Sequence, residues 1–475
     1  MLRRGASPAL ARVLSPPPAY SAIAAGMDTS AGPVFPETLH LADYFLFERL
    51  SEGLGHKTAV LYGERAYSYE YVAQRTRQAS SLFVQGGVRR GERILIVLPD
   101  TPPFAWVFFG TLAMGAVVAM ANPDVPIEQL EYLVGYTRAT AIVTLPEVAK
   151  ALRGSAATTE VRHIWVVPDT ATGEDPEGPC EVLGDPRVSD LAGDLTRVSS
   201  VHDPVPLHRD EPAIWLFTSG STGEPKANIH THRDFAFNTE VYAKATVGYA
   251  RDDVTVSVPR LYFGYATGTN LMFPFAVGAT VGLFSERPTS ETLSRAIAMY
   301  RPTVVTNVPT MLGKLLDHDR ELVAAGKPGL DFSCIRFSLS AGEALPESLL
   351  VRWNERFKSD VYDGIGSAEM FHIYASNRPG DIKPGSLGKV VRGYELAILP
   401  EDAEGPGARR CEVDEIGVLW VKGDSVSFGY WLDRDKSWKT FHGHWCRSGS
   451  TAWASRRSGG SSSCSFSRSG RGRWG

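Results

Sequence analysis

The middle of the chain alternates between short apolar runs of strand length and longer segments with helical spacing. The apolar runs cover residues 93–98, 117–120, 141–144, 214–217, 280–284 and 303–306. Helical patterns cover residues 104–114 and 128–136 between the first three runs. Strands separated by helices form parallel sheets that carry helices on both faces. The sequence therefore predicts an α/β fold.

The chain is too long for a single compact core. It has 475 residues, of which 43% are hydrophobic and 21% charged, and these proportions are those of a globular protein rather than a fibrous one. A chain of this length divides into two or more subdomains. After about residue 385 the pattern changes to short strands and turns, at 394–399 and 417–422. We therefore expect a small β-rich part at about 385–445.

One stretch, residues 104–121, has the length of a short membrane span. It is apolar except for Thr111, and it contains Gly110 and Gly115. Eighteen residues is the lower limit of spanning length. The stretch lacks flanking basic residues and stands within an α/β pattern, so we interpret it as a buried helix that leads into a strand. We expect no membrane span.

The beginning of the chain differs from its body. The first 26 residues contain Arg3, Arg4 and Arg12, no acid, and three consecutive prolines before Met27. Such a segment is either a mitochondrial transit peptide or an unstructured extension upstream of a start at Met27. The prolines favour the second interpretation because they would interrupt an amphipathic helix. We expect residues 1–34 to be a disordered leader.

The cysteines and the charge limit the setting and the partners. No pair among the five cysteines has CxxC spacing, so neither a disulfide framework nor a zinc site is indicated. A cytoplasmic location is expected, with a mitochondrial one left open. The formal net charge is −4 although the two ends are rich in arginine, so the body is acidic. An acidic body argues against nucleic acid as a partner.

The last 30 residues have an unusual composition. Residues 446–475 contain ten Ser, six Arg and six Gly, and no Asp, Glu, Lys, Leu, Ile or Val. A segment of this kind buries too little apolar surface to offset its ordering entropy. We therefore expect residues 446–475 to be a disordered tail.

The most informative segment is a loop rich in glycine and hydroxyl groups that follows the apolar run at 214–217. Its phosphate-binding candidates are Thr218, Ser219, Gly220, Ser221, Thr222, Gly223 and Lys226. Small residues allow backbone N–H groups to approach phosphate oxygens, the hydroxyls add donors, and the lysine adds a positive charge. The alternative is a plain flexible Ser/Gly loop. We expect a helix to follow from near Arg233.

This loop resembles the signature of the adenylate-forming (AMP-binding) superfamily. Further segments resemble family motifs in the same order, at residues 106–126, 340–346, 362–369, 417–423 and 429–431. The resemblance covers about residues 35–449. It implies a large adenylate-forming domain over 35–445, built from two parallel-sheet α/β subdomains and the small β-rich subdomain.

Within the superfamily the chain is most similar to benzoate–CoA ligases. Residues 363–367, followed by Glu369, Met370 and His372, are typical of that branch, as are residues 261–265. The resemblance implies that an aromatic acid attacks ATP to give an acyl-adenylate and pyrophosphate. Coenzyme A then displaces AMP and forms the thioester. The implied substrates and cofactors are a small aromatic acid, ATP, Mg²⁺ and coenzyme A, and the oligomeric state stays open.

The resemblance also implies roles for single residues. Lys226 and the loop residues from Thr218 to Gly223 would hold the phosphates, and Glu369 would bind Mg²⁺; these two charged residues are the catalytic candidates. The adenine would lie near Gly342, Glu343, Ala344, Asp363 and Gly364. Gly264, Tyr265 and His372 would line the acid pocket, although the two ring side chains could equally be ordinary core residues.

The chain departs from the family pattern at several positions. Ala368 replaces the usual threonine before the glutamate, and Ser450 stands where the family has an aspartate after Ser448-Gly449. The likeness stops after Gly449, and no lysine follows Lys439, so we expect the family's C-terminal domain, which carries a catalytic lysine, to be missing from this chain. A frameshift near codons 446–450 is one hypothesis. We therefore expect impaired activity in this truncated chain; the alternatives are an inactive nucleotide- or ligand-binding remnant and an enzyme that loads a carrier protein.

Overall fold

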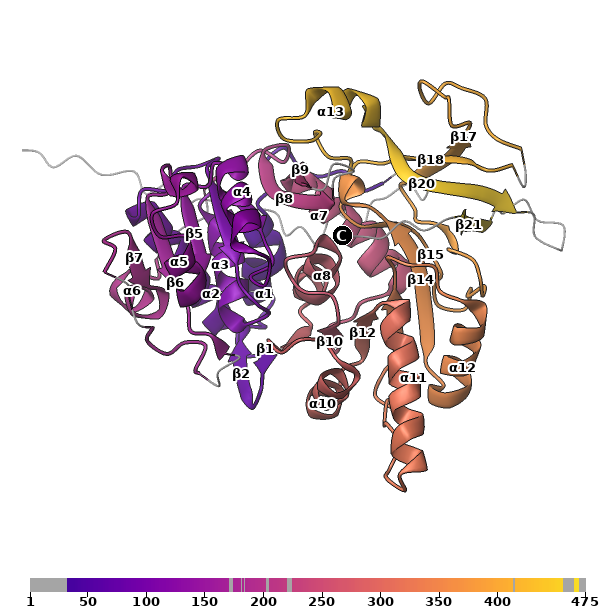
Figure 1. Cartoon of the computed structure of the whole chain (residues 1–475), viewed down its shortest axis with the longest axis horizontal. Helices are drawn as coiled ribbons and strands as arrows, with labels where there is room; N and C mark the ends of the chain where they lie inside the picture. Colours follow the sequence, from indigo (N-terminus) through magenta and orange to yellow (C-terminus); the bar gives the residue numbers. More distant parts are fainter. Residues whose placement is uncertain are drawn as a thin grey trace, which may run out of the picture.

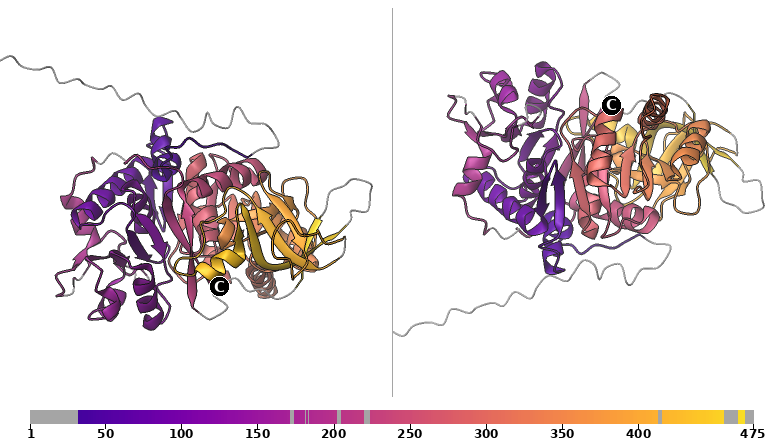
Figure 2. Two further views of the ribbon diagram at one scale, coloured as in Figure 1. Left: turned by 90° about the horizontal axis from the view of Figure 1, so that it is seen from above. Right: turned by 90° about the horizontal axis from the view of Figure 1, so that it is seen from below.

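The computed structural model describes residues 32–170, 174–180, 182, 184–201, 205–219, 224–412, 415–455 and 465–469. Two α/β lobes lie side by side, and a smaller antiparallel sheet lies above the second lobe (Figure 1). The views from above and below show the same division (Figure 2). The predicted α/β class with two parallel-sheet subdomains and a small β-rich one is confirmed. Almost all of the predicted 1–34 leader falls outside the described residues.

The first lobe contains a seven-stranded sheet of order β7-β6-β5-β3-β4-β8-β9. Its strands are β3 (Arg93–Val97), β4 (Val117–Met120), β5 (Ala141–Thr144), β6 (His163–Val166), β7 (Val188–Asp190), β8 (Pro212–Ser219) and β9 (Pro225–Thr231). Its helices are α2 (Tyr69–Gln85), α3 (Pro102–Ala113), α4 (Ile127–Thr137), α5 (Pro146–Ala151) and α6 (Leu191–Arg197). All neighbouring strands are parallel except β8 and β9.

Both faces of this sheet are covered, which explains the continuous apolar runs in the sequence. On β3, Ile94 and Ile96 pack in the core that holds α2 and α3. Leu95 and Val97 face the other way, into the core that holds α4 and α5. Successive side chains of a strand point to opposite faces, so every position of a strand that is buried on both faces favours an apolar side chain.

The second lobe contains a nine-stranded sheet of order β16-β15-β14-β13-β12-β10-β11-β1-β2. Its strands are β1 (Thr58–Tyr62), β2 (Arg65–Ser68), β10 (Val254–Ser257), β11 (Thr280–Leu283), β12 (Val304–Asn307), β13 (Phe337–Ser340), β14 (Asp360–Gly366), β15 (Ile373–Ser376) and β16 (Lys389–Val390). The helices α10 (Ser290–Tyr300), α11 (Pro309–Ala324) and α12 (Glu347–Phe357) cover one face. The other face carries α7 (His232–Asn238), η5 (Thr239–Val247), α8 (Gly264–Thr267), η6 (Gly268–Met272) and α9 (Phe273–Val277). Two short helical segments, η2 (Asp43–Phe47) and α1 (Glu48–Ser51), precede β1.

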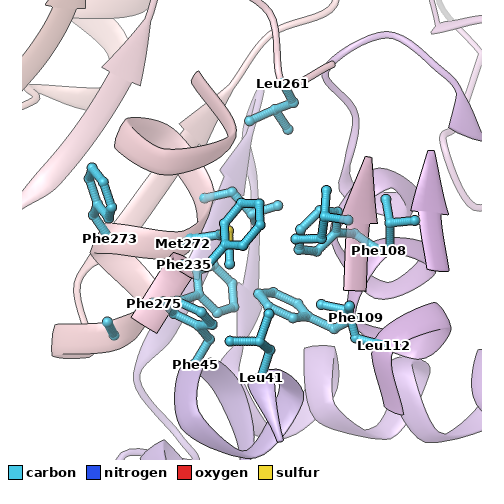
Figure 3. Packing of buried hydrophobic residues seen from close by; sticks show 14 of the residues in the cluster. Leu41, Phe45, Phe108, Phe109, Leu112, Phe235, Leu261, Met272, Phe273 and Phe275 are labelled. Atoms are coloured by element: carbon cyan, nitrogen blue, oxygen red, sulfur yellow. The ribbon is translucent and has the colours of Figure 1, made fainter. Parts of the chain in front are cut away.

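The two lobes share one apolar core. Phe108 and Phe109 of α3 lie opposite Met272 and Phe275 of the second lobe (Figure 3), and the rings of Phe109 and Phe275 are 5.2 Å apart. Every residue of α3 and β4 is buried. The interpretation of residues 104–121 as a buried helix that leads into a strand is therefore confirmed. In the part of the chain that the structure describes, no helix is long and apolar enough to cross a membrane.

The small sheet has the order β17-β18-β20-β19, and β21 pairs with β20. Its strands are β17 (Glu395–Leu399), β18 (Gly417–Lys422), β19 (Phe441–His442), β20 (Trp445–Ser455) and β21 (Ser465–Ser469), with α13 (Arg434–Thr440) before β19. The expectation of disorder over residues 446–475 differs from the structure in β20 and β21. The edge of β18 offers backbone partners to β20, and backbone pairing needs no apolar side chains. Residues 456–464 and 470–475 lie outside the described residues.

Candidate active site

A pocket of about 320 Å³ opens where strands of both lobes end. Its wall includes residues at or just after the carboxyl ends of β8, β10, β12, β13 and β14: Phe217, Val258, Val308, Ala341, Gly342 and Gly366. The carboxyl ends of parallel strands meet at one edge of a sheet, where α/β proteins bind ligands. No charged side chain is among the described residues that line this pocket.

The inner part of the pocket is aromatic. His372 lies beside Phe273 and Tyr265, with ring centres 4.8 and 5.2 Å from its own. Its Nε2 is 3.0 Å from the carbonyl oxygen of Tyr265. Because a carbonyl only accepts hydrogen bonds, Nε2 carries the proton. Burial lowers the pKa of His372 to about 3, so the imidazole is neutral. The predicted pocket residues Gly264, Tyr265 and His372 are brought together in this wall.

Two glycines set the dimensions of this aromatic region. A Cβ on Gly268 would lie 2.6 Å from Cδ2 of His372, so the imidazole rests against bare backbone. A Cβ on Gly264 would lie 2.9 Å from Cδ1 of Leu216, which also lines the pocket. Phe371 adds a third constraint, because its φ of 66° is unusual for a residue with a side chain. This backbone conformation directs the side chains of Phe371 and His372 to the pocket wall.

An ion pair between the lobes holds the segment that leads into α8. Asp100, in the loop between β3 and α3, accepts a hydrogen bond of 2.9 Å from the backbone N–H of Leu261. Its other carboxylate oxygen is 3.8 Å from the guanidinium of Arg260. Burial raises the pKa of Asp100 to about 6. The segment before Phe263 and Gly264 is thereby fixed to the first lobe.

The glycine-rich loop connects the two strands of a hairpin. The expectation of a helix from near Arg233 is met by α7, but β9 lies between the loop and the helix. Thr218 of β8 pairs in register with Lys226 of β9. Ser219 ends β8, whereas Gly220, Ser221, Thr222 and Gly223 lie outside the described residues. The hairpin thus places Lys226 at the base of the predicted phosphate loop.

Residues 427–431 run along β9 and extend its backbone pairing. The N–H of Phe428 donates to the carbonyl of Ile229, at 2.9 Å, and the N–H of Trp431 donates to that of Ala227, also at 2.9 Å. This pairing carries the start of α13 to Lys226, whose ammonium forms an ion pair with Asp433. Lys226 lowers the pKa of Asp433 through this hydrogen bond.

Glu369 lies on the same side of the site, in the single turn η7 (Ala368–Met370) after β14. Its Oε1 accepts a hydrogen bond of 2.8 Å from the hydroxyl of Tyr430, and its carbonyl accepts one of 2.9 Å from the N–H of Ser427. The ammonium of Lys436 is 4.6 Å from the centre of the Tyr430 ring. Burial and the positive charge of Lys226 lower the pKa of Lys436. We call Lys226, Glu369, Tyr430, Asp433 and Lys436 the charged cluster.

The charged cluster suits a magnesium ion held mainly by its substrate. Within the described residues no three His, Cys, Asp or Glu side chains are arranged to hold a metal. Mg²⁺ in nucleotide sites usually keeps several waters and takes one or two carboxylates together with phosphate oxygens. Asp433 is already engaged by Lys226, so the carboxylate of Glu369 is the candidate ligand of the cluster, which fits that mode of binding.

The residues predicted to surround adenine lie just after β13 and within β14. Gly342 follows β13 with a φ of 93° and lines the pocket. Glu343 and Ala344 are exposed, and Glu343 accepts a hydrogen bond of 2.7 Å from the hydroxyl of Thr310.

Asp363 is buried and pairs in register with Ser340. Gly364 follows it, and a Cβ there would lie 2.9 Å from the carbonyl oxygen of Ala375.

A family model described as "AMP-binding enzyme" matches residues 47–431. The chain belongs to this family. The benzoate–CoA ligase of Thauera aromatica is 34% identical over 419 residues, which are 87% of this chain and 74% of that protein. The 4-hydroxybenzoate–CoA/benzoate–CoA ligase of Rhodopseudomonas palustris is 31% identical, over 85% of this chain and 71% of that protein. The resemblance to the benzoate–CoA ligase branch is confirmed.

Solved structures of AMP-binding enzymes agree with the fold. The anthranilate CoA ligase AuaEII in complex with anthranoyl-AMP has a TM-score of 0.82 and 27% identity, covering 92% of this chain and 79% of that one. A benzoate CoA ligase from Burkholderia xenovorans LB400 has a TM-score of 0.78 and 29% identity, covering 91% and 80%.

Three residues of the site were missed in the sequence of this AMP-binding enzyme. Tyr430 lies within the segment 429–431, which resembles a family motif, and Asp433 and Lys436 follow it. Mixed charges after a Gly-Tyr-Trp segment were the available signal. That signal is weak, because such residues on a short helix usually face solvent.

Proposed function

We propose that this AMP-binding enzyme activates a benzoate-sized aromatic carboxylic acid with ATP and transfers the acyl group to coenzyme A. The observation that carries the proposal is an uncharged pocket of about 320 Å³ that borders the charged cluster. Phe217 and Ala368, on the pocket wall, are the sequence neighbours of Thr218 and Glu369. The names of the relatives, which are aryl-CoA ligases, support the same reaction.

The neutral state of His372 suits the first half-reaction. A flat ring would lie between the aromatic side chains of the inner pocket, where stacking and apolar burial favour it. A protonated histidine there would form an ion pair with the substrate carboxylate and weaken it as a nucleophile. Because burial keeps His372 neutral, the imidazole does not form such an ion pair, and the carboxylate keeps its strength as a nucleophile. One of its oxygens then attacks the α-phosphorus of ATP, and the bond to the β-phosphate oxygen breaks.

The charged cluster would hold the leaving pyrophosphate. Lys226 carries a positive charge at the base of the loop, and Thr218 lies opposite it. Glu369 would bind Mg²⁺, which when bound neutralises charge on the phosphates.

Gly342 and Asp363 would border the adenine, with Glu343, Ala344 and Gly364 beside them. Ser219 and residues 220–223 remain predicted phosphate ligands. In the second half-reaction the thiol of coenzyme A attacks the acyl carbon and AMP leaves.

Acid-dependent exchange of labelled pyrophosphate into ATP tests the first half-reaction. Purified protein would receive ATP, Mg²⁺ and, in turn, benzoate, 2-aminobenzoate, 4-hydroxybenzoate, malonate or decanoate. We expect exchange with one or more of the three aromatic acids and none above background with the other two. Exchange only with malonate or decanoate would contradict the substrate class. Adding coenzyme A or a pantetheinyl carrier protein to the active mixture then identifies the acyl acceptor.

A further inference from the structure

Lys436 has an unusual environment for a lysine on a short helix. Its side chain is only partly exposed, and its ammonium lies over the ring of Tyr430. Within the described residues it forms no ion pair, and it is less exposed than Lys439 on the same helix. A lysine that gives up part of its hydration without a carboxylate partner is costly unless an anion binds nearby.

One carboxylate holds both lysines of the charged cluster in place. Asp433 accepts a hydrogen bond from the ammonium of Lys226 through Oδ2 and one of 3.1 Å from the backbone N–H of Lys436 through Oδ1. The hydroxyl of Ser437 accepts a further bond of 2.9 Å from the N–H of Tyr430. The start of α13 is thereby fixed against residues 427–431, and Lys436 is directed to the ring whose hydroxyl reaches Glu369.

The charges of the cluster are arranged for a polyanion. Asp433 is engaged by Lys226, and Glu369 by the hydroxyl of Tyr430, and in the described structure neither carboxylate forms an ion pair with Lys436. Asp433 contacts the ammonium of Lys226 and the backbone N–H of Lys436. Tyr430 contacts both Glu369 and the ammonium of Lys436, so these groups form one connected cluster. A triphosphate that binds Lys226 at the loop therefore comes within reach of Lys436.

We propose that Lys436 is a second phosphate-binding cation, which with Lys226 holds the β- and γ-phosphates of ATP and then the leaving pyrophosphate. This inference rests on the function proposed above, because it assigns a further residue to the same nucleotide site. A lysine binds phosphate as a point charge and needs no fixed geometry. Its contribution is confined to ligands that carry the terminal phosphates.

The test compares three ligands on four proteins. Isothermal titration calorimetry would measure the affinity of the wild type, Lys436→Gln, Lys436→Arg and Lys439→Gln for MgATP, magnesium pyrophosphate and AMP. Lys439→Gln is the matched control, because it removes the same charge from an exposed position of α13. We expect Lys436→Gln to weaken MgATP and pyrophosphate about tenfold, the usual effect of a lost charge-assisted hydrogen bond. AMP affinity should stay within about twofold in every variant, as should all affinities of Lys439→Gln.

The outcomes separate this inference from the proposed function. Lys436→Arg should keep most of the MgATP affinity, since it keeps the charge. Equal weakening of MgATP and AMP by Lys436→Gln would show a structural role and overturn the inference, as would unchanged MgATP affinity. In both cases a wild type that binds MgATP leaves the proposed function standing. A wild type that binds neither nucleotide would overturn both.

Discussion

The acid pocket and the charged cluster are neighbours with opposite physical characters. The pocket is lined by aromatic, aliphatic and glycine residues and contains a histidine whose pKa is about 3. The charged cluster holds two lysines and two carboxylates on partly exposed positions. The first can select a ligand by shape and burial, and the second can select one only by charge.

The difference shows how each half of the site depends on the fold. The pocket is built from strand ends and the short helix α8, which the shared core and the Asp100–Arg260 pair hold rigidly. The charged cluster depends on the backbone pairing between β9 and residues 427–431 and on the ion pair between Lys226 and Asp433. A phosphate group that binds Lys226 competes with Asp433 for its ammonium. We therefore expect substitutions in the pocket to change acid affinity, and substitutions in the cluster to change nucleotide affinity or rate.

The largest effect is expected from Glu369→Gln, which removes the proposed magnesium ligand. An amide is a weaker ligand for a hard cation, so acid-dependent pyrophosphate exchange should fall by about 100-fold. Acid affinity should be unchanged because Glu369 does not line the pocket. Glu347→Gln, at an exposed position at the start of α12, is the control. Full exchange activity in Glu369→Gln would show that Glu369 is not needed to bind the nucleotide or its magnesium ion.

Gly264→Val tests the opposite half. Its Cβ would push against Leu216, and the added methyl groups would reduce the pocket. We expect the KM for benzoate to rise by about tenfold, the scale of one or two misplaced methyl groups in an apolar pocket, with MgATP affinity unchanged. Gly313→Val, where a Cβ meets no atom within 4 Å, controls for the exchange of glycine for valine in a helix. A change in the KM for ATP without a change in the KM for benzoate would contradict the proposed separation of the acid pocket from the charged cluster.

The buried histidine predicts how stability changes with pH. The pKa of His372 is lowered by burial to about 3, below the ordinary value of about 6.5. Between these values the unfolded chain binds a proton that the folded chain does not. The free energy of unfolding should therefore fall on acidification from about pH 6.5, by up to about 1.4 kcal/mol per pH unit for this group.

Urea unfolding of the wild type and His372→Gln at pH 7.5, 6 and 5 measures this contribution. We expect a shallower pH dependence in His372→Gln than in the wild type. His444→Gln, which changes an exposed histidine, should keep the slope of the wild type. An equal slope in all three proteins would mean that His372 is not held neutral by burial.

The smallest effect is expected from salt. Raising NaCl from 50 to 500 mM screens charges at exposed positions, so the Kd for MgATP should increase by about a few-fold. The pocket wall carries no charged side chain among the described residues, and the Kd for benzoate should change less than that for MgATP. Isothermal titration with each ligand at both salt concentrations makes the comparison. A larger salt effect on benzoate than on MgATP would contradict the assignment of the two halves.

Much of the fold could be predicted because its strands are buried on both faces. The apolar runs at 117–120 and 141–144 coincide with β4 and β5, since a two-sided environment leaves an uninterrupted apolar signal. β9 was missed because Lys226, Asn228 and His230 interrupt its apolar pattern, and its pairing with β8 and residues 427–431 is a tertiary fact. β20 was missed because strand pairing through the backbone leaves little trace in composition.

The sequence by itself determined the fold class, the family and the local motifs, because periodicity, glycine positions and the order of motifs are properties of the chain. It also named Lys226, Glu369, Tyr265 and His372 as candidates. Only the tertiary structure decided which candidates share a wall, that His372 is neutral, and that Tyr430, Asp433 and Lys436 lie beside Lys226 and Glu369. Burial and charge pairing depend on contacts between residues some 200 positions apart, such as Lys226 and Asp433, and no local pattern encodes them.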